Sequence, residues 1–184
     1  MSDAALAALA DRPFELLKAL ESRARAAAAG LQAAYGGEEW VGLGFRVGGL
    51  KLVVAREEIR ELMPYPGAHR VPGAKNWLLG LANVRGQLLP IVDMKSFLGG
   101  GDTAVSRISR VLTIDHPSVP AGLLVDEVYG FRRFHDNDSA DFDAGSLPAA
   151  EAYLAGGFGR NEETWGVIGL QRLVESPAFL QAAK

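Results

Sequence analysis

The stretch from residue 71 to residue 94 constrains this 184-residue chain more than any other part of its sequence. Between Trp77 and Val92 the only ionisable side chain is Arg85, which lies beside Gly86 where two apolar runs meet. Two buried strands joined by a tight turn produce such a pattern, because strands favour apolar residues and turns favour glycine. The sequence therefore predicts a hairpin that holds one guanidinium at its turn, either as solvated surface or as a contact for a partner.

A second hairpin is predicted between residues 41 and 54, where apolar side chains occupy every second position. The alternation stops at Gly48 and Gly49 and resumes after them. A Gly-Gly pair between two alternating runs is typical of a β-hairpin. The alternating side chains are Val41, Leu43, Phe45, Val47, Leu50, Leu52 and Val54.

Residues 56–63 are predicted to form a short helix, because Ile59, Leu62 and Met63 have the spacing of one helical face. Pro64 and Pro66 then prevent the helix from continuing.

Most of the remaining chain predicts short strands, at residues 110–114, 121–125, 128–134, 154–160 and 165–170. A helical turn is expected at 93–98 and a terminal helix at 170–183, and the glycine-rich loop at 99–102 is the expected internal boundary. Many short strands with glycine turns favour a mainly β fold, a barrel or a sandwich, over a parallel sheet. Residues 11–31 predict an amphipathic helix that either packs against the domain or docks to a partner.

Composition narrows the classes of function. The net charge of -3 gives no basic footprint for nucleic acid, and the absence of cysteine excludes disulfides and thiolate metal sites. The start of the chain lacks the basic and apolar regions of a signal peptide, and no apolar run approaches the roughly 18 to 20 residues that cross a bilayer. We therefore expect a cytoplasmic protein that reaches membranes only through partners.

No cluster of residues suggests catalysis, a cofactor or a metal ion. His69, His116 and His135 lie in separate predicted loops without metal-ligand spacing. The acidic segment at 136–143 resembles a calcium loop only superficially, since Ala140 and Asp141 stand where a ligand and a glycine would be required. We expect a protein that is not an enzyme.

The most suggestive polar residue besides Arg85 is Glu61. A carboxylate facing the guanidinium would fix its plane through a bidentate pair. An exposed pair of this kind stabilises a fold by only about 0–1 kcal/mol, so its value would lie in orientation.

With these residues in view, the chain resembles the CheW-like family of chemosensory coupling proteins. The fingerprint is Gly-Leu-Ala-Asn-Val-Arg-Gly-Gln-Leu-Leu-Pro-Ile-Val-Asp-Met at residues 80–94. Gly-Leu-Leu-Val-Asp-Glu-Val-Tyr-Gly at 122–130 matches a second family segment, and Ile-Arg-Glu-Leu at 59–62 resembles a third. The likeness runs from about residue 40 to residue 174.

Within the family, the chain is most similar to the members that serve twitching motility by type IV pili. That likeness rests on Pro-Phe-Glu-Leu-Leu at 13–17, on residues 40–46 and 85–91, and on the tail at 165–167 and 176–180.

The resemblance implies two intertwined five-stranded β-barrel lobes at residues 38–174, a helical extension at 1–37 and a tail at 175–184. It also implies a non-enzymatic adaptor, without cofactor, between the cytoplasmic tip of a methyl-accepting chemoreceptor and the regulatory domain of a CheA-like histidine kinase. Pro64 and Pro66 depart from the family pattern and are expected to alter the rim of the receptor groove between the lobes.

The expected sites follow from the matched positions. The receptor groove would use Ile59, Glu61, Asn83, Arg85 and Gly86. For the kinase, exposed apolar residues at strand ends are the expectation, because transient interfaces need a small dry centre. The candidates are Val84, Leu88, Val128, Tyr129 and Phe131, although core packing explains each of them equally well.

Two other functions stay open at this point. A coupling protein of a flagellar chemotaxis system would have the same family motifs, and a small-ligand-binding β-barrel would have a similar strand pattern but needs a polar cluster that the sequence does not offer.

Overall fold

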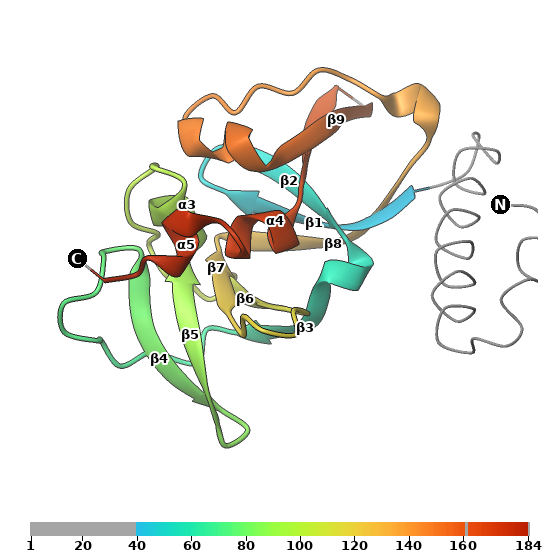
Figure 1. The fold of residues 1–184 in the computed structure, drawn as a ribbon. Helices are drawn as coiled ribbons and strands as arrows, with labels where there is room; N and C mark the ends of the chain where they lie inside the picture. The colour runs from blue at the N-terminus through green and yellow to red at the C-terminus, as the bar shows by residue number, and fades with distance from the viewer. Residues whose placement is uncertain (1–39, 161, 184) are drawn as a thin grey trace, which may run out of the picture. The chain divides into compact units, whose positions relative to one another are not determined.

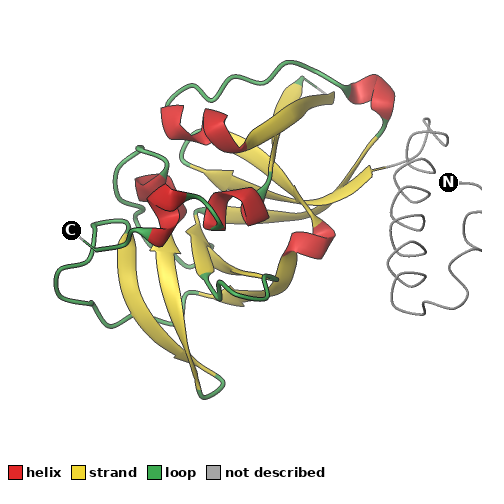
Figure 2. Cartoon of the chain, in the orientation of Figure 1, coloured by secondary structure: helices red, strands yellow, loops and turns green. Residues whose placement is uncertain are grey.

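A computed structural model of the chain describes residues 40–160 and 162–183 (Figure 1). The helix predicted at residues 11–31 lies outside the described residues. Figure 2 shows that strands dominate the described part and that its helices are short. The strands are β1 (Trp40–Val47), β2 (Leu50–Ala55), β3 (Ile59–Pro64), β4 (Leu78–Val84), β5 (Gln87–Asp93), β6 (Arg110–Ile114), β7 (Gly122–Val125), β8 (Glu127–Phe134), β9 (Leu154–Arg160) and β10 (Glu163–Ile168). The α-helices are α3 (Met94–Phe97), α4 (Leu170–Val174) and α5 (Pro177–Leu180), and 3-10 helices occupy Arg56–Glu58, Asp136–Asp138 and Pro148–Tyr153.

The strands form two five-stranded sheets, which confirms the predicted mainly β fold. The first sheet has the order β8-β1-β2-β10-β9 and the second has the order β3-β6-β7-β5-β4. Neighbours are antiparallel except for the β2–β10 and β5–β7 pairs. Because β5 and β6 lie in the same sheet, the loop at 99–102 does not separate the two sheets. The expected internal boundary was wrong, since the first sheet combines two early strands with the last three.

The predicted helix at residues 56–63 was also wrong. One 3-10 turn occupies Arg56–Glu58, and β3 follows, paired antiparallel with β6. In β3 the side chains of Ile59, Glu61 and Met63 are half-buried, whereas those between them are exposed. The period of two belongs to a strand, and pairing with β6 overrides the coincidental helical spacing of the apolar residues.

Each sheet is buried on both of its faces. Leu52, Val53 and Val54 are all fully buried, although neighbouring strand residues point to opposite sides. Leu52 and Val54 contribute to a core shared by the two sheets, whereas Val53 packs with Phe134 and Trp165 in a separate cluster. Residues of the second sheet likewise divide between the shared core and a cluster of its own. Two-sided burial explains why these strands are continuous apolar runs.

The edge strands of the first sheet approach each other through side chains. The ring of Phe134 on β8 stacks on Phe158 of β9, with 4.6 Å between ring centroids. Arg160 Nη1 donates to the Arg133 carbonyl oxygen at 2.6 Å. No ladder pairs β8 with β9 in the described ranges. The first sheet is therefore a strongly curled five-stranded sheet whose two edge strands, β8 and β9, lie close to each other.

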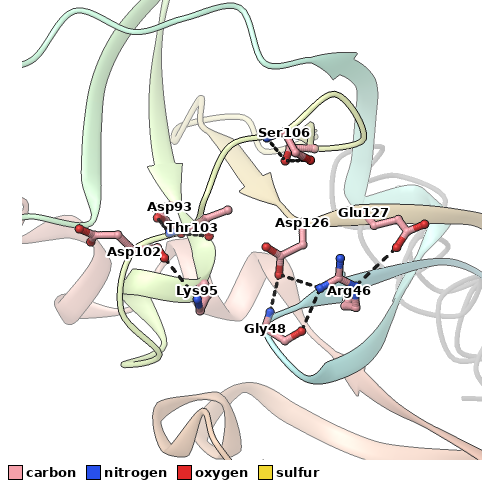
Figure 3. A network of polar contacts seen from close by, with 10 residues as sticks. Arg46, Gly48, Asp93, Lys95, Asp102, Thr103, Ser106, Asp126 and Glu127 are labelled. Atoms are coloured by element: carbon pink, nitrogen blue, oxygen red, sulfur yellow. Dashed lines mark hydrogen bonds and ion pairs between the residues drawn. The ribbon is translucent and has the colours of Figure 1, made fainter.

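Two aspartates of the sequence fingerprints prove to be structural (Figure 3). Asp93, which is 1% exposed, accepts hydrogen bonds from the backbone N–H of Ser96 at 3.2 Å and from the N–H and hydroxyl of Thr103, both at 2.7 Å. Asp126 accepts from the Gly48 N–H at 2.5 Å and lies 3.7 Å from Arg46 Nη1. Asp93 thus fixes the loop after β5, and Asp126 fixes the β1–β2 turn against the start of β8.

The end of the chain forms two short helices instead of the single predicted one. Ser176 lies between the two helices and caps the start of α5. Its hydroxyl accepts a hydrogen bond from the Phe179 N–H at 3.3 Å. Pro177 suits the first turn of α5 but cannot continue α4. The helix α4 buries Leu170, Leu173 and Val174 in the core that the two sheets share, so it packs against both sheets. No helix of the described residues is long and apolar enough to cross a membrane.

Candidate functional site

The turn between β4 and β5 presents Arg85 in a strained backbone conformation. Val84 pairs with Gln87, so Arg85 and Gly86 alone form the turn, with φ values of 52° and 82°. Two positive φ angles match the right-handed twist of a hairpin, but the left-handed region costs a residue with a side chain about 1–2 kcal/mol. The Asn83 side-chain oxygen accepts a hydrogen bond from the Gly86 N–H at 2.9 Å and supports the turn. Strain retained at a non-glycine residue is a reason to examine that residue for function.

Glu61 on β3 ion-pairs with Arg85 through Arg85 Nη2 and one carboxylate oxygen. The sequence predicted this pair, although it placed Glu61 on a helix. Arg85 is exposed and Glu61 is the more buried partner, so the carboxylate is the fixed end of the pair. The contact joins the β4–β5 turn to β3, the opposite edge strand of the second sheet.

A hollow of about 530 Å³ lies beneath this pair. We call it the hairpin hollow. Val84 and Leu88, which we predicted for the kinase side, line the same hollow as Arg85 and Glu61. Its lining consists of Arg60, Glu61, Met63, Val84, Arg85, Gln87, Leu88, Leu89, Thr113, Ile114, His116 and Pro120.

Thr113 and His116 also line this hollow, although no sequence pattern pointed to them as site residues. Thr113 Oγ1 is buried and has no hydrogen-bond partner among the residues that the structure describes. The His116 ring accepts at Nδ1 from the N–H groups of Ser118 and Val119, so Nε2 carries the proton that it shares with Glu175 at 3.0 Å. Both residues reach the hollow from β6 and the loop that follows it, which local patterns cannot reveal.

A second hollow, of about 510 Å³, lies between the two sheets. We call it the inter-sheet groove. Leu62 of β3 and Phe131 of β8 are unusually exposed for apolar residues, at 42% and 56%. They line the groove from opposite sheets, together with Leu43, Arg56, Ile59, Arg60, Glu61 and Asp115. Glu61 and Arg60 therefore line both hollows, and β3 runs between them.

Val128 and Tyr129, the other two residues predicted for the kinase side, line neither of these hollows. Val128 is half-buried and packs against the shared core. Tyr129 is half-buried too, and its ring meets Trp165 edge to face at 5.6 Å between centroids. Both positions of β8 contribute to packing, and Phe131 is the exposed apolar residue of this strand.

Polar contacts connect β3 and the 3-10 turn before it to α4 and to the residue that follows β6. The Glu58 carboxylate accepts a hydrogen bond from the Gln171 N–H at 2.8 Å, close to the start of α4. Arg60 Nε lies 4.0 Å from the Asp115 carboxylate. These contacts help to hold the start of β3, which contains Ile59 and Glu61, in place.

The two hollows are suited to binding a polypeptide. They combine exposed apolar side chains with an arginine–glutamate pair on a rigid sheet, and such mixed surfaces recognise helices and loops. Within the described residues, no group of three or more His, Asp or Glu side chains could hold a metal ion.

Comparison with known proteins gives a consistent answer. Residues 41–178 match the CheW-like domain. The chain is 39% identical over 176 residues to Protein PilI of Pseudomonas aeruginosa, covering 93% of this chain and 96% of that protein. It is 29% identical to Protein FrzA of Myxococcus xanthus over 136 residues, covering 72% and 83%.

A solved structure shares the fold. The scaffolding protein TtCheW of Thermoanaerobacter tengcongensis superposes with a TM-score of 0.65 at 20% identity, covering 77% of this chain and 96% of that one. The family match spans most of the described residues, including both hollows and the Arg85 turn. The chain belongs to the family of CheW-like proteins.

Proposed function

We propose that this chain is a non-enzymatic coupling adaptor that links methyl-accepting chemoreceptors to a CheA-like histidine kinase in type IV pilus twitching motility. The observation that carries the proposal is the exposed Arg85 turn, held by Glu61 above the hairpin hollow in a CheW-like domain. The twitching-motility assignment is supported by 39% identity to PilI over 93% of the chain, well beyond the central fingerprint. Family membership supports a role as scaffold without a reaction of its own.

We assign the receptor side to the inter-sheet groove and the adjoining Arg85 turn. The apolar walls made by Ile59, Leu62 and Phe131 suit the apolar face of a receptor helix. Glu61 and Arg85 would then pair with polar residues at the edge of that helix, while Asn83 and Gly86 hold the turn in shape.

We assign the kinase side to Val84 and Leu88, which flank the Arg85 turn in the hairpin hollow. Leu88 is 67% exposed there and Val84 lies beside it. A small apolar centre of this kind suits a transient interface. Phe131, which was predicted for the kinase, lines the inter-sheet groove and falls on the receptor side in this assignment, and Val128 and Tyr129 form the packed base of its strand.

The mechanism would be positional. The two sheets are joined by the shared core, by α4 and by the Glu58–Gln171 bond, so a receptor lying in the groove would act on both sheets. We further propose that each sheet is barrel-like, which its two-sided burial supports, and that the protein works in the cytoplasm at receptor arrays to which its partners bring it.

A pull-down with the cytoplasmic fragment of a twitching-motility receptor tests the proposal. Arg85→Glu should abolish most of the binding, whereas Arg107→Glu, a charge reversal at another exposed arginine, should leave it unchanged. Equal binding by both variants would contradict the assignment. Capture of a flagellar receptor in preference to the twitching receptor would assign the chain to flagellar chemotaxis instead.

A further inference from the structure

A third hollow, of about 290 Å³, lies on the first sheet and shares no lining residue with the hairpin hollow or the inter-sheet groove. We call it the arginine hollow. It is lined by Arg132, Arg133, Phe134, Arg160, Glu163 and Trp165. Three arginines at one depression are unexpected in a chain whose net charge is -3. We propose that the arginine hollow binds an acidic peptide segment of a partner protein.

Arg132 lies over an aromatic ring in this hollow. Its guanidinium carbon lies 5.6 Å from the centre of the Trp165 ring, which is itself buried. Gly44 makes this possible, because a Cβ there would come within 2.9 Å of the Trp165 ring and 3.0 Å of Arg132 Cγ. A guanidinium stacked on an aromatic face keeps its edge for a carboxylate, so Arg132 is oriented in advance for a bidentate pair.

Arg160 supplies a second fixed guanidinium from a different strand. Its Nη1 donates to the Arg133 carbonyl oxygen across the seam between β8 and β9. A guanidinium has five N–H donors, so this bond positions the group and leaves donors for a ligand. Arg132 and Arg160 thus come from the two edge strands of the first sheet.

Glu163 is the acidic residue among the described residues that line the hollow. Glu163 is paired with Lys51 at 2.5 Å, and this bond, followed by the charges of Lys51 and Arg132, holds the pKa of Glu163 below its usual range. Asp138 accepts a hydrogen bond from the His135 N–H at 2.8 Å within its own loop. The charges of Lys51 and Glu163 cancel, so this glutamate does not offset the charges of Arg132 and Arg160.

The shape of the site favours a peptide over a membrane surface. A flat anionic bilayer is matched by an open or convex basic patch, whereas this site is concave and has aromatic rings at its base. An acidic polypeptide can place successive carboxylates on Arg132 and Arg160.

Fluorescence anisotropy with the full chain tests this inference. The probe is a short fluorescein-labelled peptide of alternating glutamate and serine, and a glutamine-for-glutamate version is the neutral control. Arg132→Gln and Arg160→Gln should each weaken binding roughly tenfold, the value of one charge-assisted pair. Arg107→Gln, at an exposed arginine of another loop, should change it less than about twofold, and added salt should weaken wild-type binding.

Several results would overturn the inference: equal affinity for the neutral peptide, an equal effect of Arg107→Gln, or binding to phosphatidylserine vesicles but not to the acidic peptide. Because Arg132 also packs on Trp165, thermal unfolding is measured for each variant. If Arg132→Gln unfolds, Arg160→Gln and the charge-conserving Arg132→Lys decide the question. The assay contains neither receptor nor kinase, so it fails or succeeds independently of the coupling function.

Discussion

Arg85 and Glu61 form an ion pair in which the arginine side chain is 77% exposed and the glutamate side chain only 29%. The glutamate belongs to a strand and the arginine to a two-residue turn. The ion pair therefore holds the long, exposed side chain of Arg85 against the less exposed carboxylate of Glu61. Most of the guanidinium stays accessible to a partner.

Exchanging the charges of Glu61 and Arg85 tests whether the receptor needs the guanidinium at the turn or only the ion pair. The double variant Glu61→Arg with Arg85→Glu keeps an ion pair at the same place, so its free energy of unfolding should stay within about 1 kcal/mol of wild type. Receptor binding, measured by pull-down, should remain lost because the guanidinium now projects from β3. Recovery of binding in the double variant would mean that only the pair itself is needed.

The left-handed backbone of Arg85 predicts opposite effects on stability and binding. Arg85→Gly removes the cost of a side chain at a φ of 52° and should leave the free energy of unfolding equal or up to about 1 kcal/mol higher. Arg85→Ala retains the strain and serves as the control. Both variants should lose receptor binding. Greater destabilisation by glycine than by alanine, measured by urea denaturation, would count against strain at this turn.

Asp93 is predicted to be essential for stability and not for recognition. Asp93→Ala removes a buried carboxylate and leaves the half-buried N–H groups of Ser96 and Thr103 without their acceptor, which should lower the free energy of unfolding by about 2–4 kcal/mol. Asp102→Ala, at an exposed aspartate of the same loop, should cost less than about 1 kcal/mol. Similar losses for the two variants in denaturant titrations would show that the Asp93 network is not a major support.

The Lys51–Glu163 pair predicts a measurable titration. The hydrogen bond from Lys51 lowers the pKa of Glu163 below the ordinary 4.5, so the stabilisation from this pair is present above the ordinary value and is lost as the pH falls through the lowered pKa. Carbon-detected NMR should place the Glu163 midpoint below those of exposed glutamates. In Lys51→Met the midpoint should rise toward 4.5, and an unchanged midpoint would exclude Lys51 as the main cause.

Local sequence patterns predicted the elements that local interactions determine. The β1–β2 and β4–β5 hairpins, α3 and the strands β6 to β10 lie close to their expected positions, because alternation and turn residues are adjacent in the chain. The strand β3 was missed because Ile59, Leu62 and Met63 happen to match a helical face. Its true partner β6 comes from a distant part of the sequence.

The candidate site was predictable to the same extent. Arg85 and Glu61 were identified from their sequence context, and the structure brings them together. Thr113 and His116 were not, since only folding brings β6 and its following loop to the hollow. Likewise, Ile59, which was predicted for the receptor, and Phe131, which was predicted for the kinase, line one groove, because β3 and β8 belong to different sheets that face each other there.

The most direct test of the coupling function is reconstitution of receptor, CheA-like kinase and this chain, with kinase autophosphorylation as the readout. We predict that the wild-type chain makes the autophosphorylation rate depend on the receptor, and that Arg85→Glu, although folded, does not. A rate that is the same with the wild-type chain, with Arg85→Glu and with no added chain would contradict the account.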